Sequence, residues 1–171
     1  MLRNFCNLFT FSLIIYRFVN AYKSNGIDIW GQTIENEPGT FPYNSLQMTP
    51  EQQRDFIKLN LGPTLAKAGL VPEKFKVMIY DFNRDDVVNF SRTVLIDKEA
   101  AKYVNGIAFH WYGNGNAPPE LLDVLAKEFL DHFILNTEAS VMDANRGHGD
   151  NLHLGSWGSG EAYANDIITV K

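Results

Sequence analysis

The chain has 171 residues, of which 45% are hydrophobic, 13% aromatic and 20% charged, and its formal net charge at pH 7 is −5. A chain of this length ordinarily forms one domain with a buried core. The acidic balance, without a basic stripe, argues against a nucleic-acid-binding surface. The single cysteine, Cys6, excludes an internal disulfide framework and any metal site built from several cysteines.

The N-terminal segment allows two interpretations. Arg3, the apolar stretch Leu8–Tyr16 and the small-residue sequence Val19-Asn20-Ala21 together fit a signal peptide. The alternative, which the periodicity favours, is an amphipathic helix packed on a sheet. Its apolar stripe consists of Phe11, Ile14, Ile15, Phe18, Val19 and Tyr22. The apolar stretch is too short to span a bilayer.

Four segments have the pattern of strands, and three of them are apolar until a polar residue appears at the carboxyl end. They are Ile27–Thr33, Lys76–Asp81, Gly106–Tyr112 and Phe133–Ala139. Such runs are typical of parallel strands that are covered on both faces.

Helices are expected between these strands. The capping box Thr49-Pro50-Glu51-Gln52 predicts a helix to about Asn60, and Gly62-Pro63 predicts a kink or a second helix to Ala68. Other helices are expected over 85–95, over 97–104, after Pro118-Pro119 and over 160–170. The alternation predicts a parallel α/β sheet with right-handed crossovers. A closed (β/α)8 barrel takes ~250 residues, so residues 1–171 correspond to about half of one barrel domain.

Two glutamates follow strands at opposite ends of this series. Glu37 comes after the first strand, between Asn36 and Pro38, and Glu138 comes at the end of the fourth. A barrel brings the carboxyl ends of its strands to one mouth, and glycosidic hydrolysis needs two facing carboxylates. Glu37 is the candidate general acid, and Glu138 is the candidate nucleophile if the two lie ~5 Å apart. The alternative for Glu37 is a loop glutamate before a turn proline.

Other polar residues at the strand ends are candidates for substrate binding. His110-Trp111-Tyr112 ends the third strand, where rings can cover a sugar face while the imidazole and phenol bond its hydroxyls; an ordinary core tryptophan with polar neighbours is the alternative. The Asn36 amide can bond a sugar hydroxyl. Asp81 and Arg84 are expected to form an ion pair that either orients a catalytic carboxylate or is purely structural.

Two further features of the sequence bear on the candidate site. Glu35 is a further acidic candidate that we expect to play a supporting role. No metal site is expected, because His148 and His153 lack a third convincing ligand.

Several of these motifs, in order, resemble the glucosylceramidases (acid β-glucosidases) of glycoside hydrolase family 30. The resemblance covers about Tyr16 to Thr169. It runs through Ile29-Trp30-Gly31, Glu35-Asn36-Glu37-Pro38, Phe41-Pro42-Tyr43, Thr49 to Phe56, Leu61 to Ala66, Glu99 to Val104, Gly106-Ile107-Ala108, His110-Trp111-Tyr112, Thr137-Glu138-Ala139, Leu154 to Trp157 and Ile167-Ile168-Thr169.

The resemblance implies a retaining β-glucosidase that hydrolyses glucosylceramide with Glu37 as acid/base and Glu138 as nucleophile. It also implies that Asn36, His110, Tyr112 and Arg84 contact the substrate pocket, to which we add Trp111. It implies no metal or organic cofactor, a lysosomal location, a saposin-type activator and a lipid surface. Ser45 and Ser140 stand where familiar members carry cysteine, so those thiols are not expected to be chemically required.

The same resemblance implies that this chain corresponds to strands four to seven of the barrel. Strands one to three, strand eight and a β-rich domain are absent from it, and residues 1–15 do not match. We therefore expect a truncated or atypically spliced product with an atypical, signal-like start. Its own turnover is expected to be negligible, because half the pocket is missing. A related β-glycosidase with another substrate and an inactive fragment that binds sugar, lipid or a partner are the alternatives.

Overall fold

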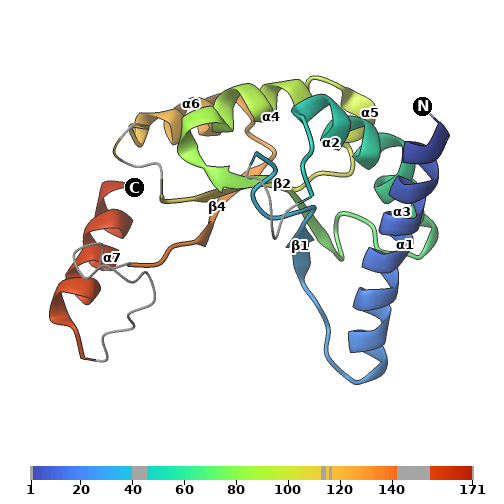
Figure 1. The fold of residues 1–171 in the computed structure, drawn as a ribbon, viewed down its shortest axis with the longest axis horizontal. Coiled ribbons are helices and arrows are strands. Elements are labelled where there is room, and N and C mark those ends of the chain that lie inside the picture. Colours follow the sequence, from blue (N-terminus) through green and yellow to red (C-terminus); the bar gives the residue numbers. More distant parts are fainter. Residues whose placement is uncertain (1, 40–45, 113–114, 116, 142–154, 171) are drawn as a thin grey trace.

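A single sheet of four parallel strands forms the centre of the molecule. The computed structural model describes residues 2–39, 46–112, 115, 117–141 and 155–170 (Figure 1). The strands are β1 (Gly31–Thr33), β2 (Lys76–Asn83), β3 (Gly106–His110) and β4 (Phe133–Glu138). They lie in the order β1-β2-β3-β4 and every pair is parallel. The expected half of a (β/α)8 barrel is confirmed.

The first strand is shorter than expected, since only Gly31–Thr33 of the segment Ile27–Thr33 joins the ladder. Strand β1 lies at the edge of the sheet with β2 as its one neighbour. Among the described residues, the segment before β1 has no neighbouring strand on its outer side, and Ile27 and Trp30 in it are 53% and 56% exposed. An edge of this kind exposes backbone groups and apolar side chains that a further strand can cover.

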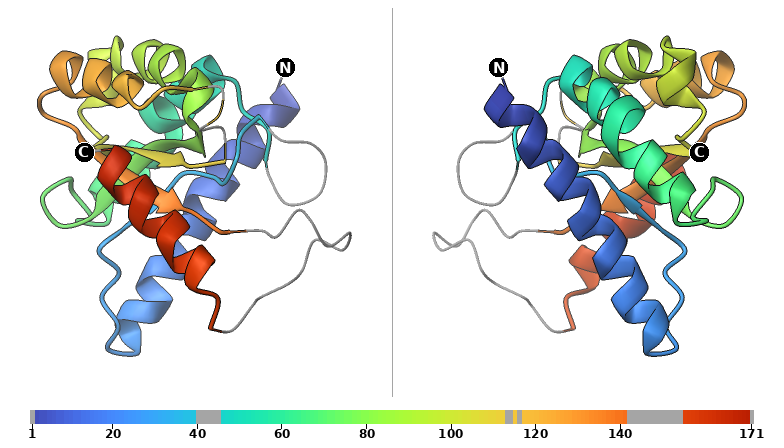
Figure 2. Two further views of the ribbon diagram at one scale, coloured as in Figure 1. Left: turned by 90° about the vertical axis from the view of Figure 1, so that its left-hand side faces the viewer. Right: turned by 90° about the vertical axis from the view of Figure 1, so that its right-hand side faces the viewer.

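Helices lie over the sheet and at its two ends. Those between the strands are α2 (Pro50–Phe56), α3 (Gly62–Lys67), α4 (Val87–Leu95), α5 (Lys98–Ala101) and α6 (Glu120–Glu128). Figure 1 shows α2, α4 and α6 in a layer over one face of the sheet. The helices α1 (Leu2–Ser24) and α7 (Trp157–Thr169) lie on opposite sides, each facing the viewer in one half of Figure 2.

The connection between α2 and α3 follows the sequence signals closely. The Thr49 hydroxyl accepts the Gln52 N–H at 3.2 Å, and the Gln52 side chain accepts the Thr49 N–H at 2.9 Å, so the capping box is confirmed. A π-helical turn over Ile57–Leu61 separates the two helices. Pro63 follows it and has no N–H to donate to the preceding turn, so a wider turn accommodates the proline without a break in the helix.

The amphipathic helix expected near the N-terminus is confirmed as α1, but its main contacts are with the turn over Ile57–Leu61 and with α3 rather than with the sheet, and its buried face differs from the predicted stripe. Ile15 and Val19 are buried at 6% and 3% exposure, whereas Ile14, Phe18 and Tyr22 are 56%, 49% and 43% exposed. Half of the apolar stripe therefore faces away from the core. No helix among the described residues is long and apolar enough to cross a membrane.

Close approach of β1 to β2 depends on a glycine. A Cβ at Gly31 would lie 2.5 Å from the backbone oxygen of Lys76. We expect Gly31→Ala to push the edge strand outward and to lower the free energy of unfolding by about 1–3 kcal/mol, as overpacking does. Urea unfolding measures this. Gly160→Ala is the matched control, because a Cβ there would meet nothing within 4 Å apart from the backbone of its own helix. Equal losses in the two variants would contradict the account.

Candidate active site

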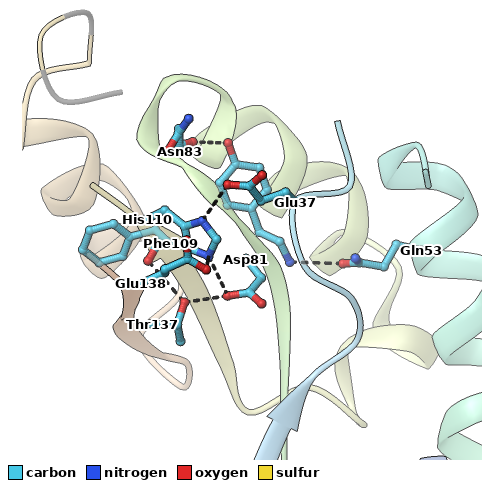
Figure 3. A network of polar contacts seen from close by, with 9 residues as sticks. Glu37, Gln53, Asp81, Asn83, Phe109, His110, Thr137 and Glu138 are labelled. Atoms are coloured by element: carbon cyan, nitrogen blue, oxygen red, sulfur yellow. Dashed lines mark hydrogen bonds and ion pairs between the residues drawn. The ribbon is translucent and has the colours of Figure 1, made fainter. Parts of the chain in front are cut away.

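Four elements bring polar side chains together at the carboxyl ends of the strands (Figure 3). Glu37 comes from the loop after β1, Asp81 from β2, His110 from the end of β3, and Glu138 from the end of β4. This convergence is what a parallel barrel sheet predicts for residues at strand ends.

His110 is the centre of the cluster and is only 1% exposed. Its Nδ1 lies 3.3 Å from Glu37 Oε1, and its Nε2 lies 3.2 Å from Asp81 Oδ1 and 3.9 Å from Glu138 Oε2. Burial lowers the pKa of this imidazole, but the hydrogen bond and charge of Asp81, with Glu138 and Glu37 nearby, outweigh burial and raise the pKa overall. The ring therefore stays protonated to a higher pH than an ordinary histidine.

Asp81 is the charged partner of His110. Burial raises the pKa of its carboxyl, but hydrogen bonds from His110, Thr137 and Thr33 outweigh burial, so that the pKa is lowered overall. The Thr137 hydroxyl donates at 2.5 Å. Asp81 is thus a fixed carboxylate that holds the imidazole in place.

Glu37 and Glu138 face each other across the cluster. One oxygen of each and a ring nitrogen of His110 all lie within 4.8 Å of one another. The side chains of Glu37 and Glu138 are 22% and 45% exposed, so both can be reached from solvent. The Glu37 N–H also donates to the Asp81 backbone oxygen at 2.9 Å, which ties the loop after β1 to β2.

Strand β2 is distorted where it carries Asp81. Tyr80 and Asp81 have φ values of 76° and 64°, and the register with β3 shifts between Tyr80 and Phe82. Glu37 also has a positive φ, of 50°. Non-glycine residues adopt this region rarely, and bulges next to active sites re-aim side chains. Nothing in the sequence predicts this bulge, because no glycine marks it.

Glu35 and Gln53 form a buried polar pair next to the bulge, and only Glu35 was a candidate from the sequence. Glu35, for which we expected a supporting role, is 8% exposed and accepts a hydrogen bond from the Gln53 side chain at 3.2 Å. Burial raises the pKa of Glu35 to about 8, although the Gln53 bond lowers it. Gln53 itself is fully buried and was not predicted, since it reads as an ordinary helical residue of α2.

The buried carboxyl of Glu35 makes stability depend on pH. Above its ordinary pKa of 4.5 the unfolded chain ionises Glu35 while the folded chain keeps it neutral until about pH 8, so stability falls across that window. We expect Glu35→Gln to be more stable than the wild type at pH 8 by on the order of 2–4 kcal/mol, and equally stable at pH 4. Urea unfolding at both pH values measures this. The exposed Glu73→Gln should show no such gain; a gain that is equal at pH 4 and pH 8 would contradict the account.

The two aromatic residues after β3 lie at the rim of the site rather than in the core. The Trp111 ring stacks on Tyr163 of α7 with centroids 5.0 Å apart and an interplanar angle of 12°. Tyr112 is 37% exposed, and its hydroxyl bonds to Glu138. Burial, with the hydrogen bond and charge of Glu138, raises the pKa of Tyr112 to about 12, so the phenol remains a donor.

Two other predicted site residues, Asn36 and Arg84, lie outside the cluster around His110. Asn36 is exposed in the loop between β1 and α2. Arg84 is 2% exposed, and its Nε and Nη2 donate to the Ala117 oxygen at 3.3 and 3.0 Å. The expected Asp81–Arg84 ion pair is wrong, because the bulge turns the Asp81 carboxylate toward His110 and burial keeps Arg84 against the loop before α6.

Glu37, His110 and Glu138 also form, among the described residues, a group close enough to hold a metal ion. Both ring nitrogens of His110 already face carboxylates, so an ion would displace these contacts. We therefore interpret the group as one that shares protons. His148, His153, Ser45, Phe41-Pro42-Tyr43 and Leu154 lie outside the described residues.

Comparison with known proteins bears on the same region. Residues 7–170 match the model of the glycosyl hydrolase family 30 TIM-barrel domain. The chain is 40% identical over 159 residues to putative glucosylceramidase 3 of Caenorhabditis elegans, covering 90% of this chain and 30% of that protein. It is 36% identical over 166 residues to mouse (Mus musculus) lysosomal acid glucosylceramidase, covering 94% of this chain and 31% of that protein.

A solved structure is also similar to this chain in fold and sequence. An endo-β1,6-glucanase superposes with a TM-score of 0.72 and 31% sequence identity over 82% of this chain and 31% of that one. The chain thus spans about 30% of the length of the curated relatives it matches. Since the family model covers nearly the whole chain, and the observed half-barrel agrees with it, the chain belongs to glycosyl hydrolase family 30.

Proposed function

We propose that this chain carries the catalytic pair of a retaining β-glucosidase that acts on glucosylceramide. The observation that carries the proposal is the approach of a Glu37 oxygen and a Glu138 oxygen to within 4.8 Å. Retaining glycosidases have their two carboxyl groups roughly 5 Å apart, whereas inverting enzymes separate them by about 6.5–9.5 Å to admit a water molecule. The spacing therefore favours a nucleophile and an acid/base over an inverting pair.

The proposed reaction has two steps. Glu138 attacks the anomeric carbon while Glu37 donates its proton to the glycosidic oxygen, which breaks the bond to the aglycone and leaves a glycosyl ester on Glu138. Water then attacks the same carbon, Glu37 takes a proton from it, and the ester breaks. The charged His110 beside Glu37 stabilises the carboxylate that forms after the first proton transfer.

The remaining residues have proposed roles around this pair. The Tyr112 phenol donates to Glu138 and fixes the orientation of the nucleophile. The Trp111 ring offers an aromatic face at the rim, and the exposed Asn36 amide is free to turn toward a sugar hydroxyl. Contact of Arg84 with substrate stays a prediction, and its burial against Ala117 favours support of the loop before α6 instead.

The substrate is inferred from the relatives. Two of them are named glucosylceramidases, one of these lysosomal, while the endo-glucanase has another glycan as its substrate. We propose glucosylceramide presented on a lipid surface with a saposin-type activator, in an acidic lysosomal compartment, and no organic or metal cofactor. The pKa shifts of Glu35 and His110, both raised, support an acidic setting because both make the fold more stable below neutral pH.

The test uses a barrel chimaera, in which residues 7–170 of this chain replace the matching segment of the C. elegans glucosylceramidase. We expect the chimaera to release glucose from glucosylceramide in detergent micelles faster than from a soluble alkyl β-glucoside, and not to cleave β-1,6-glucan. Preference for the glucan would make the chain a glucanase of the same family. The 171-residue chain, measured alongside, is expected to show negligible turnover.

An inactive binding chain is the second candidate, and one observation favours it. The last four residues of β4 are exposed, as are the apolar side chains of Ile14 and Phe18 on α1 and Ile167 and Ile168 on α7. Exposed apolar surfaces of this kind are what a binding partner or further strands would cover. If the catalytic pair only needs further strands, the chimaera should turn over substrate and the 171-residue chain alone should not. No turnover from the chimaera or from the chain would favour the second candidate.

A further inference from the structure

Gln53 connects two segments that carry the candidate site, although it lies outside it. The side chain is fully buried on α2. Its Nε2 donates to Glu35 Oε1 at 3.2 Å, and its Oε1 accepts the backbone N–H of Tyr80 at 3.2 Å. Figure 3 shows Gln53 reaching from α2 to the β2 backbone. One amide group thus holds the loop after β1 and the bulge of β2 at a fixed spacing.

The bulge creates the need for this contact. The register with β3 shifts between Tyr80 and Phe82, and here the Tyr80 N–H donates to the Gln53 side chain. This contact matters because a buried N–H without an acceptor destabilises the fold. The direction of the Tyr80 N–H fixes the orientation of the Gln53 amide, whose NH₂ must then face Glu35. The bond from Gln53 to Oε1 is the one hydrogen bond that the Glu35 carboxyl makes among the described residues, because Oε2 is buried without a partner.

Asp81, the residue after Tyr80, contacts the candidate catalytic groups directly through its backbone and its side chain. The Asp81 backbone oxygen accepts the Glu37 N–H at 2.9 Å, and the Asp81 carboxylate bonds His110 at 3.2 Å. A shift of the bulge therefore moves both the Glu37 backbone and the carboxylate that orients His110.

We propose that Gln53 and Glu35 are positioning residues, which act through the Tyr80–Asp81 bulge to fix Glu37 and His110. The inference rests on the proposed function only in that it regards Glu37 as the acid/base. The placement of His110 by the bulge does not depend on that function. Below pH 8 the neutral Glu35 carboxyl accepts from Gln53 without placing a charge behind the sheet.

The test measures the protonation of His110 in the full 171-residue chain by NMR pH titration of the imidazole. Its signal is assigned by its disappearance in His110→Gln. In the wild type we expect a pKa above the ordinary 6.5, which reflects contact with Asp81. Gln53→Leu removes the acceptor of the Tyr80 N–H, and we expect the His110 pKa to fall because burial then outweighs the displaced Asp81. The exposed Gln47→Leu is the matched control and should titrate as the wild type.

A rescue variant separates positioning from general loss of structure. In Glu35→Gln/Gln53→Glu the new carboxyl still accepts the Tyr80 N–H, and the new amide donates to it, so the pair is rebuilt with its polarity reversed. We expect the raised His110 pKa to return in this double variant. An unshifted pKa in Gln53→Leu, no recovery in the double variant, or an ordinary pKa in the wild type would each overturn the proposal.

The same variants in the barrel chimaera separate this inference from the proposed function. We expect Gln53→Leu to lower kcat about 10- to 100-fold with little change in KM, as loss of one buried hydrogen bond behind a catalytic group would. A wild-type chimaera without turnover, together with a His110 pKa that still depends on Gln53, contradicts the function alone. Full turnover in Gln53→Leu contradicts the positioning role alone.

Discussion

Replacement of Glu138 by glutamine is expected to abolish covalent labelling of the barrel chimaera by a mechanism-based β-glucosidase inactivator. Glutamine has nearly the shape of glutamate but an amide oxygen is too weak a nucleophile to form the glycosyl ester. Turnover should fall by roughly 10⁴- to 10⁶-fold, as in other hydrolases that lose a nucleophile. Intact-protein mass spectrometry detects the adduct, and peptide mapping should locate it on Glu138 in the wild-type chimaera.

The control for this experiment is Glu161→Gln on α7, whose exposed carboxylate bonds the Trp157 indole and lies outside the cluster. It should label and turn over as the wild type. Persistent labelling of Glu138→Gln, or an adduct on Glu37, would show that the nucleophile has been assigned to the wrong residue.

Replacement of Glu37 by glutamine is the second large effect that we expect. Loss of the general acid should lower kcat about 10²- to 10⁴-fold on glucosylceramide, whose leaving alcohol needs a proton. An activated aryl β-glucoside needs no proton for departure, so the glycosyl ester should still form in Glu37→Gln and then accumulate. A burst of released phenol followed by a slow steady rate measures this.

Chemical rescue checks the same assignment. Azide, which needs no general base, should restore the rate of the slow second step. Equal losses on both substrates, without a burst, would contradict the acid/base role.

The sequence predicts the scaffold well because local signals and global order agree. Four apolar strands, the capping box at Thr49 and the alternation of helix and strand all point to a parallel half-barrel, and the structure agrees. The prediction that Glu37 and Glu138 converge follows from the same geometry, since Glu37 follows one parallel strand of the sheet and Glu138 ends another.

The parts that the sequence could not predict depend on contacts between distant segments. The bulge at Tyr80–Asp81 lacks a glycine and is supported by Gln53 from another helix, so no local pattern marks it. This bulge also explains why the expected pair of Asp81 with Arg84 is wrong. The buried face of α1 was predicted only in part, because periodicity shows that an apolar stripe exists but not which half of it faces the core.

The anomeric configuration of the first sugar released tests the central claim most directly. Proton NMR of the barrel chimaera acting on an aryl β-glucoside, recorded before mutarotation, should show β-glucose first, because two displacements at the anomeric carbon retain configuration. This result would agree with Glu37 and Glu138 oxygens within 4.8 Å of each other. Initial release of α-glucose would require water to attack directly between more widely spaced carboxylates, and would contradict the proposed pair.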